Sequence, residues 1–126
     1  MFKKSETISS EKINTLIGHG TRFEGSLHAS GTIRIDGEFQ GDIHLKGDII
    51  IGEEGKIVGN INANNIVNSG MIQGNITTAN QLKICSNGKV LGDIQVKSLI
   101  VEEKANFDGK CKMQGEIIQE IKSESF

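Results

Sequence analysis

A five-residue phrase, in which a central glycine is flanked two positions away on each side by an apolar residue, occurs six times along this 126-residue chain. The central glycines are Gly25, Gly41, Gly59, Gly74, Gly92 and Gly109. They lie 16, 18, 15, 18 and 17 residues apart. A near-constant period of this length is typical of a solenoid, in which each repeat stacks only on its neighbours. A solenoid grows along one axis and has two ends, so the next question is what those ends contact.

Apolar side chains recur at equivalent positions of every repeat. Alternation with a period of two places them on one side of short strands. The first set is Phe23, Phe39, Ile57, Ile72, Val90 and Phe107, and the second is Ala29, Leu45, Ala63, Thr78, Val96 and Met113. A third set consists of the pairs Ile33/Ile35, Ile49/Ile51, Ile66/Asn68, Leu82/Ile84, Leu99/Val101 and Ile117/Gln119. Since each set repeats its chemistry, the chain is predicted to be all-β, a parallel β-helix of about six turns rather than a sandwich.

The repeats define the expected domain boundaries. Residues 1–14 and 120–126 are polar and carry no repeat, so we expect short disordered tails around a core at residues 15–119. Ile17 lies six residues before Phe23, a spacing found between later repeats. Residues 15–18 therefore look like the remnant of a preceding turn.

The composition excludes several classes of function. A net charge of −2 provides no basic field for nucleic acid. The longest apolar run is three residues and the amino terminus has no secretory pattern, so a cytoplasmic protein without a membrane span is expected. Cys111 falls on an inward position and Cys85 on an outward one, so a disulfide between them is not expected.

No constellation of catalytic or metal-binding residues is evident. His28 and His44 occupy one outward column, but that column continues as Asn62, Thr77, Gln95 and Lys112 and offers no third ligand. We therefore expect no enzyme activity, cofactor or metal. The alternative is a closed β-helical oligomer with enzymatic or ligand-binding activity, similar to the hexapeptide-repeat acyltransferases. Their apolar positions recur every six residues, whereas the intervals here vary between two and six.

The ends of the predicted rod show no convincing cap, and an uncapped strand edge recruits other strands. Phenylalanine occupies the first and last turns of its column, where it either fills a flared core or contacts another molecule. The second interpretation predicts a polymerisation interface. Its members are Leu16, Ile17 and Phe23 at the amino end, and Phe107, Cys111 and Met113 at the carboxyl end.

Residues 16–25 (LIGHGTRFEG), 33–43 (IRIDGEFQGDI) and 105–113 (ANFDGKCKM) resemble the bactofilin family. The resemblance covers residues 15–115 in order. It implies a right-handed β-helix that polymerises without nucleotide into non-polar cytoskeletal filaments. Such filaments lie at the inner face of the bacterial cytoplasmic membrane and organise cell-wall or polarity proteins, with consequences for cell shape.

The first four residues, Met1, Phe2, Lys3 and Lys4, are similar to the membrane-targeting segment of many bactofilins. An aromatic ring can insert at the interface, and each lysine adds about 1 kcal/mol of attraction to anionic lipid. The proline-rich tails of the family are missing, because this chain contains no proline. Partner binding through such tails is therefore not expected.

A lateral stripe is the last predicted feature. The outward residue between each inward pair is Arg34, Ile50, Val67, Lys83, Ile100 and Ile118, of which Ile50, Val67, Ile100 and Ile118 are apolar. This stripe predicts side-by-side contact between filaments. The overall prediction is a self-assembling, membrane-associated scaffold without catalysis.

Overall fold

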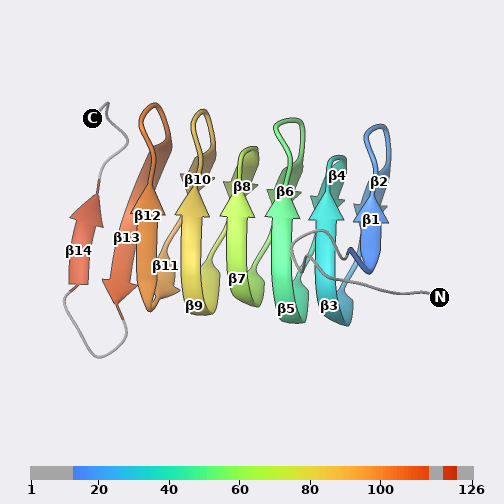
Figure 1. Cartoon of the computed structure of the whole chain (residues 1–126), viewed down its shortest axis with the longest axis horizontal. Coiled ribbons are helices and arrows are strands. Elements are labelled where there is room, and N and C mark those ends of the chain that lie inside the picture. The colour runs from blue at the N-terminus through green and yellow to red at the C-terminus, as the bar shows by residue number, and fades with distance from the viewer. Residues whose placement is uncertain (1–12, 114–117, 122–126) are drawn as a thin grey trace.

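The computed structural model describes residues 13–113 and 118–121, and within them the chain is a solenoid of short strands without a helix. Figure 1 shows the strands side by side along one long axis, with the corners between them projecting at the top. The strands facing the viewer run upward, the chain returns behind them, and the coil advances from right to left. That winding is right-handed. The prediction of an all-β parallel β-helix of about six turns is confirmed.

Three parallel faces make up each turn. The first face contains β2 (Arg22–Glu24), β4 (Glu38–Gln40), β6 (Lys56–Val58), β8 (Met71–Gln73), β10 (Lys89–Leu91) and the start of β13 (Asn106–Met113). The second face contains the first halves of β3 (Leu27–Ile35), β5 (Ile43–Ile51), β7 (Ile61–Asn68) and β9 (Ile76–Ile84), then β11 (Ile94–Val96) and the end of β13. The third face contains β1 (Thr15–Ile17), the second halves of β3, β5, β7 and β9, and β12 (Ser98–Val101).

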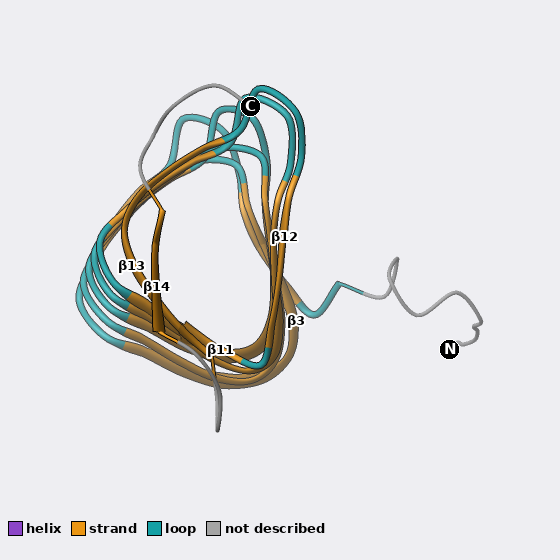
Figure 2. Cartoon of the chain, turned by 90° about the vertical axis from the view of Figure 1, so that its left-hand side faces the viewer, coloured by secondary structure: helices purple, strands orange, loops and turns teal. Residues whose placement is uncertain are grey.

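The register between turns matches the predicted columns. Phe23 pairs with Phe39, and Ile33 with Ile49. Strand β1 pairs Ile17 with Ile35, so residues 15–17 are the last strand of an incomplete preceding turn, as predicted. Figure 2 shows successive turns overlying one another around a common interior.

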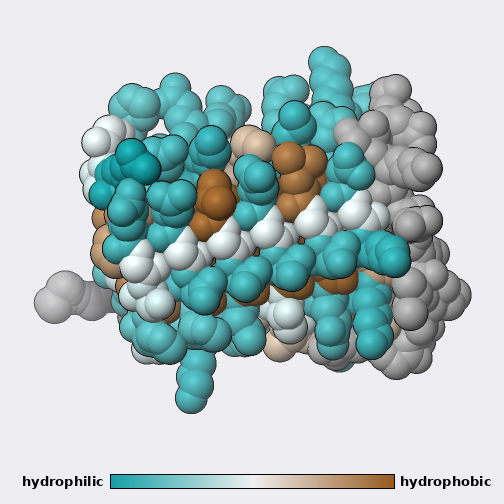
Figure 3. Space-filling model, turned by 180° about the vertical axis from the view of Figure 1, so that it is seen from behind, coloured by the Kyte–Doolittle hydropathy of each residue, from teal (hydrophilic) through white to brown (hydrophobic). Residues whose placement is uncertain are grey.

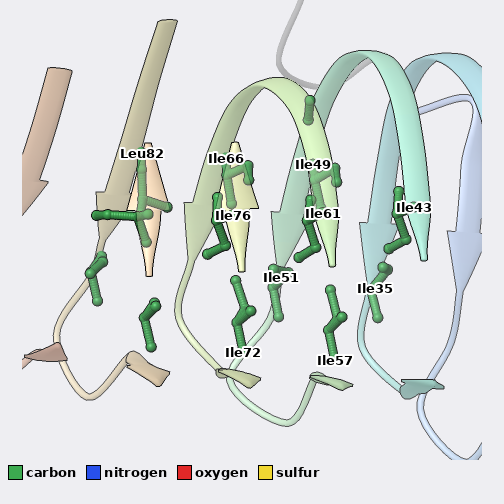
Figure 4. Close-up of a cluster of buried hydrophobic side chains, with 14 of the residues drawn as sticks. Ile35, Ile43, Ile49, Ile51, Ile57, Ile61, Ile66, Ile72, Ile76 and Leu82 are labelled. Atoms are coloured by element: carbon green, nitrogen blue, oxygen red, sulfur yellow. The ribbon is translucent and has the colours of Figure 1, made fainter. Parts of the chain in front are cut away.

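Isoleucine fills most of that interior. In Figure 4 the side chains of Ile43, Ile61 and Ile76 from the second face meet those of Ile57 and Ile72 from the first. All five are at most 2% exposed. A β-branched side chain suits this position because it packs well on a pleated surface and has few rotamers to lose.

Glycine recurs at the same corner of every turn because the backbones of successive turns lie too close together there for a side chain. The six motif glycines have φ between +136° and +152°, a region that L side chains rarely adopt. A Cβ built on Gly59 would lie 1.8 Å from the carbonyl oxygen of Gly41, one turn earlier. The motif glycine is therefore required by backbone conformation and by the spacing between turns.

The column that follows the glycines ties each turn to the next. The backbone N–H groups of Asn60, Asn75, Asp93 and Lys110 each donate to the side-chain Oδ1 atom of the residue one turn earlier, at 3.2–3.3 Å. Every residue of this column is polar in the sequence. The structure adds that its bonds run from side chain to main chain, which explains the preference for Asp and Asn.

Asn68 is a buried amide in an otherwise apolar column. It is 0% exposed, its Nδ2 donates to the carbonyl oxygen of Lys89 at 3.1 Å, and its Oδ1 accepts from the N–H of Gly70 at 2.9 Å. These bonds close a short corner and fasten it to the next turn, so the amide is satisfied despite its burial.

Register shifts accommodate the shortest repeat. The gap from Ala63 to Ile66 is one residue shorter than the gap from Leu45 to Ile49. A one-residue change would turn the following side chains outward in a regular strand. The pairing shifts between His44 and Asp48, and again between Ala63 and Asn65, which keeps Ile66 inside.

The carboxyl end departs from the predicted pattern. Strand β14 (Ile118–Ile121) runs antiparallel to β13 and pairs Lys112 with Ile118 and Cys111 with Gln119. The predictions that Ile118 extends the lateral stripe and that Gln119 continues the column of Asn68 and Ile84 place both residues on the third face, and both are wrong in that position. The chain reverses direction instead of beginning another parallel turn, so β14 lies on the second face, where Gln119 pairs with inward Cys111. Ile117 lies outside the described residues, as do residues 1–12 and 122–126 of the predicted tails.

Thr78 provides a test of the packing. Its side chain is 0% exposed and its Oγ1 has no hydrogen-bond partner in the part of the chain that the structure describes. A buried unsatisfied hydroxyl costs about 1–3 kcal/mol. We expect Thr78→Val to raise the free energy of unfolding by about 1 kcal/mol and Tm by about 4 °C. Thermal unfolding followed by circular dichroism measures this. The exposed neighbour variant Thr77→Val should leave Tm unchanged, and a lower Tm for Thr78→Val would contradict the assignment.

Candidate assembly surfaces

The described residues leave the amino end of the rod open. Strands β1 and β2 and the first half of β3 have no strand before them among the described residues. Phe23 is 36% exposed on its outer side, while its ring stacks on Phe39 with centroids 4.9 Å apart and an interplanar angle of 11°. Leu27 and Ala29 are only partly buried against the core. The apolar interior is thus accessible from this end.

A charged rim borders this apolar end. Arg22 lies 3.0 Å from the carboxylate of Glu24 and 3.8 Å from that of Glu38. All three side chains are well exposed, so these pairs add little to stability. An apolar centre with a polar rim is the usual arrangement of a protein interface.

Leu16 lies in the first strand of the amino end and points to the side of the rod. It pairs with Arg34 and therefore heads the outward column of the third face. It is 61% exposed, whereas Ile17 points into the core and is 9% exposed. The sequence assigns both residues to the amino-end surface. The structure places Leu16 on the side of the rod, although at its first strand.

The carboxyl end is more enclosed. Phe107 and Cys111 are 0% exposed, and Met113 is partly buried against the core. Burial raises the pKa of the Cys111 thiol and so keeps it protonated. Strand β14 covers the second-face edge of β13. The prediction that this end has no cap is therefore wrong. The residues after β13 are too few for a stable helix, but four of them are enough to form a strand that pairs with the free edge of β13.

Three residues of the predicted lateral stripe lie on one face of the rod. Ile50 and Val67 are half-buried and Ile100 is 41% exposed, all on the third face. The two cations of the same column, Arg34 and Lys83, each lie beside a carboxylate. Arg34 Nε donates to Asp36 Oδ2 at 2.9 Å, a bond that raises the pKa of the guanidinium, and Lys83 lies 3.5 Å from Glu102.

The rear of the molecule is mainly polar. In Figure 3 a pale band crosses the rod lengthwise between hydrophilic rows, with two hydrophobic groups above it. The first face carries Val58 and Leu91 as half-buried apolar residues among Gln40, Gln73 and Asp108. This surface offers less continuous apolar contact than the amino end.

The two histidines stack on the second face, with ring centroids 4.8 Å apart. Within residues 13–113 and 118–121, no three His, Cys, Asp or Glu side chains lie close enough together to hold a metal ion. The same residues include no helix long and apolar enough to cross a membrane. Both cysteines are free.

Comparisons with known proteins agree with the fold. The family model of the bactofilins, described as polymer-forming cytoskeletal proteins, matches residues 15–112. A cryo-EM reconstruction of double helical filaments of bactofilin from Thermus thermophilus is similar, with a TM-score of 0.73 and 26% identity over 79% of this chain and 98% of that one. A crystal structure of a phenylalanine-to-arginine mutant of that bactofilin is also similar, with a TM-score of 0.67 and 25% sequence identity. That match covers 70% of this chain and 98% of the mutant's chain. No curated protein sequence matches.

Proposed function

Because this chain belongs to the bactofilin family of polymer-forming cytoskeletal proteins, we propose that it assembles by stacking its β-helices end to end into non-polar filaments, without nucleotide. The open amino end is the observation that carries this proposal. Phe23 is exposed at the end of a column whose next members, Phe39 and Ile57, are 0% exposed. A second copy placed against this end would bury Phe23 and continue the column.

Non-polar growth requires two kinds of contact. An amino-to-amino contact is isologous, so the same surface on two copies meets across a two-fold axis. Growth beyond a pair then requires a carboxyl-to-carboxyl contact. Alternation of the two produces an open filament rather than a ring.

Electron microscopy of the purified chain without nucleotide or metal tests the proposal. We expect long filaments in negative stain. Small discrete particles over a wide range of protein and salt concentrations would instead support the closed oligomer.

We also propose that the filament lies on the inner face of the cytoplasmic membrane and there organises proteins of the cell wall or of cell polarity. Residues 1–4 lie outside the described residues, and the support for this proposal is their chemistry. One such segment binds weakly, but a filament presents many copies on one surface, and avidity multiplies their effect.

Deletion of residues 1–4 should release the filaments from liposomes that contain anionic lipid, without dissolving them. The physical reason is the loss of one aromatic anchor and two lysines from every subunit. Co-sedimentation with liposomes measures binding, and microscopy of the supernatant shows whether filaments persist. If the shortened filaments still sediment with liposomes, these residues are not the anchor.

Side-by-side contact between filaments is proposed for the third face. Replacing Ile50 and Val67 with lysine should leave single filaments but remove pairs and bundles, because the added charges repel across a lateral contact. The matched control places lysine at Gln73 and Gln40 of the first face. Bundling that persists in the first variant would assign lateral contact to another surface.

A further inference from the structure

Strand β14 differs from every other described strand in its direction. All other pairings between described strands are parallel and join equivalent positions of different turns. Strand β14 runs antiparallel to residues 109–112 of β13, and Figure 1 shows the two arrows pointing in opposite directions at the end of the rod. It occupies the edge on which a further turn, or another molecule, would pair.

The direction of a strand added at this edge depends on the kind of contact. If a second copy joined head to tail, its strands would continue the same winding and would run parallel to β13. If two carboxyl ends met across a two-fold axis, the facing windings would be opposed, so their edge strands would run antiparallel. Strand β14 therefore has the direction that strand β13 of a second copy would have in a carboxyl-to-carboxyl contact.

The amino end provides the contrast. No described strand covers β1, β2 or the first half of β3 on that side, and Phe23 remains accessible. At the carboxyl end, Phe107 and Cys111 are fully buried and the edge of β13 already has a partner. The two ends of one rod are thus in different states in the free chain.

We propose that β14 is an internal substitute for strand β13 of a second copy, and that the carboxyl end joins another molecule only after β14 leaves this edge. This inference rests on the proposed assembly through both ends. It predicts that amino ends pair first and that release of β14 limits elongation.

A disulfide that locks β14 in place tests this directly. The register places Lys110 directly opposite Glu120, and Lys110 is exposed to oxidant. Directly opposed residues of antiparallel strands generally have a Cα separation that a disulfide can bridge. The double variant Lys110→Cys, Glu120→Cys is made with Cys85→Ser to remove the other accessible thiol. After oxidation, confirmed by intact mass, sedimentation should show pairs of chains. Reductant should restore filaments in the same sample.

Each outcome separates this inference from the proposed function. Oxidised protein that forms filaments as long as those of reduced protein overturns the inference and leaves the assembly intact. Failure of the disulfide to form also overturns it, because paired residues must lie within bridging distance. If unmodified protein forms no filaments in any condition, the proposed function fails first.

A second variant weakens β14 instead of locking it. Gln119→Pro removes a backbone N–H and disfavours pairing in a strand of four residues. The critical concentration for filaments should fall about tenfold, the scale expected for a few cross-strand pairs. The control Ser123→Pro, beyond the strand, should leave it unchanged. An unchanged or higher critical concentration for Gln119→Pro would overturn the proposed competition.

Discussion

Replacing Phe23 with arginine is expected to abolish filaments while the free chain stays folded. In the free chain this side chain is 36% exposed, so an arginine can reach water, and the main loss is one aromatic stacking contact worth about 0.5–1.5 kcal/mol. In an amino-to-amino contact the charge would be enclosed without a partner, at a cost of about 3–5 kcal/mol. Because both copies carry it, association should weaken more than about a thousandfold.

Sedimentation velocity and circular dichroism together measure this result. The variant should show a strand spectrum and, at most, pairs of chains joined through their carboxyl ends. Gln73→Arg is the control, because it places an arginine on the exposed, outward side of β8, away from both ends of the rod. Filaments of normal length from Phe23→Arg at the wild-type critical concentration would exclude the amino end as a contact.

The same substitution at Phe107 has a different expected effect. The sequence suggests equivalent roles for the two phenylalanines, but Phe107 is 0% exposed in the free chain. An arginine there would disturb the last turn of the core as well as any contact. Phe23 is therefore the more selective position at which to separate assembly from folding.

Gly59→Ala is expected to have the largest effect on stability. Its φ of +144° costs an alanine about 1–3 kcal/mol, and the new Cβ would lie 1.8 Å from the carbonyl oxygen of Gly41. That oxygen belongs to the backbone of the preceding turn, so the turns must separate. We expect a loss of about 4 kcal/mol or more, a large part of the stability of a domain this size.

Alanine substitutions at two other glycines distinguish the cost of backbone strain from the cost of the clash between turns. Gly25 has a similar φ of +136°, but it is the first of its column and its Cβ would meet only a ring atom of Phe23 at 3.7 Å. Gly25→Ala should therefore cost only the conformational strain. Gly18→Ala, with nothing within 4 Å, should cost little. Urea unfolding, at protein concentrations too low for assembly, measures the free energy of unfolding of the three variants and so ranks them. Equal losses for Gly25→Ala and Gly59→Ala would show that contact between turns does not determine the glycine column.

The repeat makes the fold predictable, because alternation identifies the inward side chains and the period identifies the turns. The buried positions of Phe39, Ile49 and Val90 follow from these two patterns alone. So does the incomplete turn that contains Ile17, whose spacing from Phe23 matches that of later repeats.

The surfaces were less predictable for physical reasons. Alternation shows which side chains share a face, but it does not show the direction in which a final strand runs. Residues 117 and 119 have the spacing of an inward pair in either direction, so the reversal at β14 and the displacement of Ile118 from the stripe could not be seen. That Leu16 points to the side of the rod follows from alternation, because its neighbour Ile17 points inward, and its contact with a second copy stays a prediction.

X-ray fibre diffraction from aligned filaments tests most directly whether the rods join end to end. In that arrangement every strand lies across the filament axis, and the spacing between turns continues through each contact. End-to-end stacking predicts a strong meridional reflection at about 4.8 Å, the spacing of paired strands. A reflection of that spacing on the equator would mean that the rods lie across the filament, and would contradict stacking through their ends.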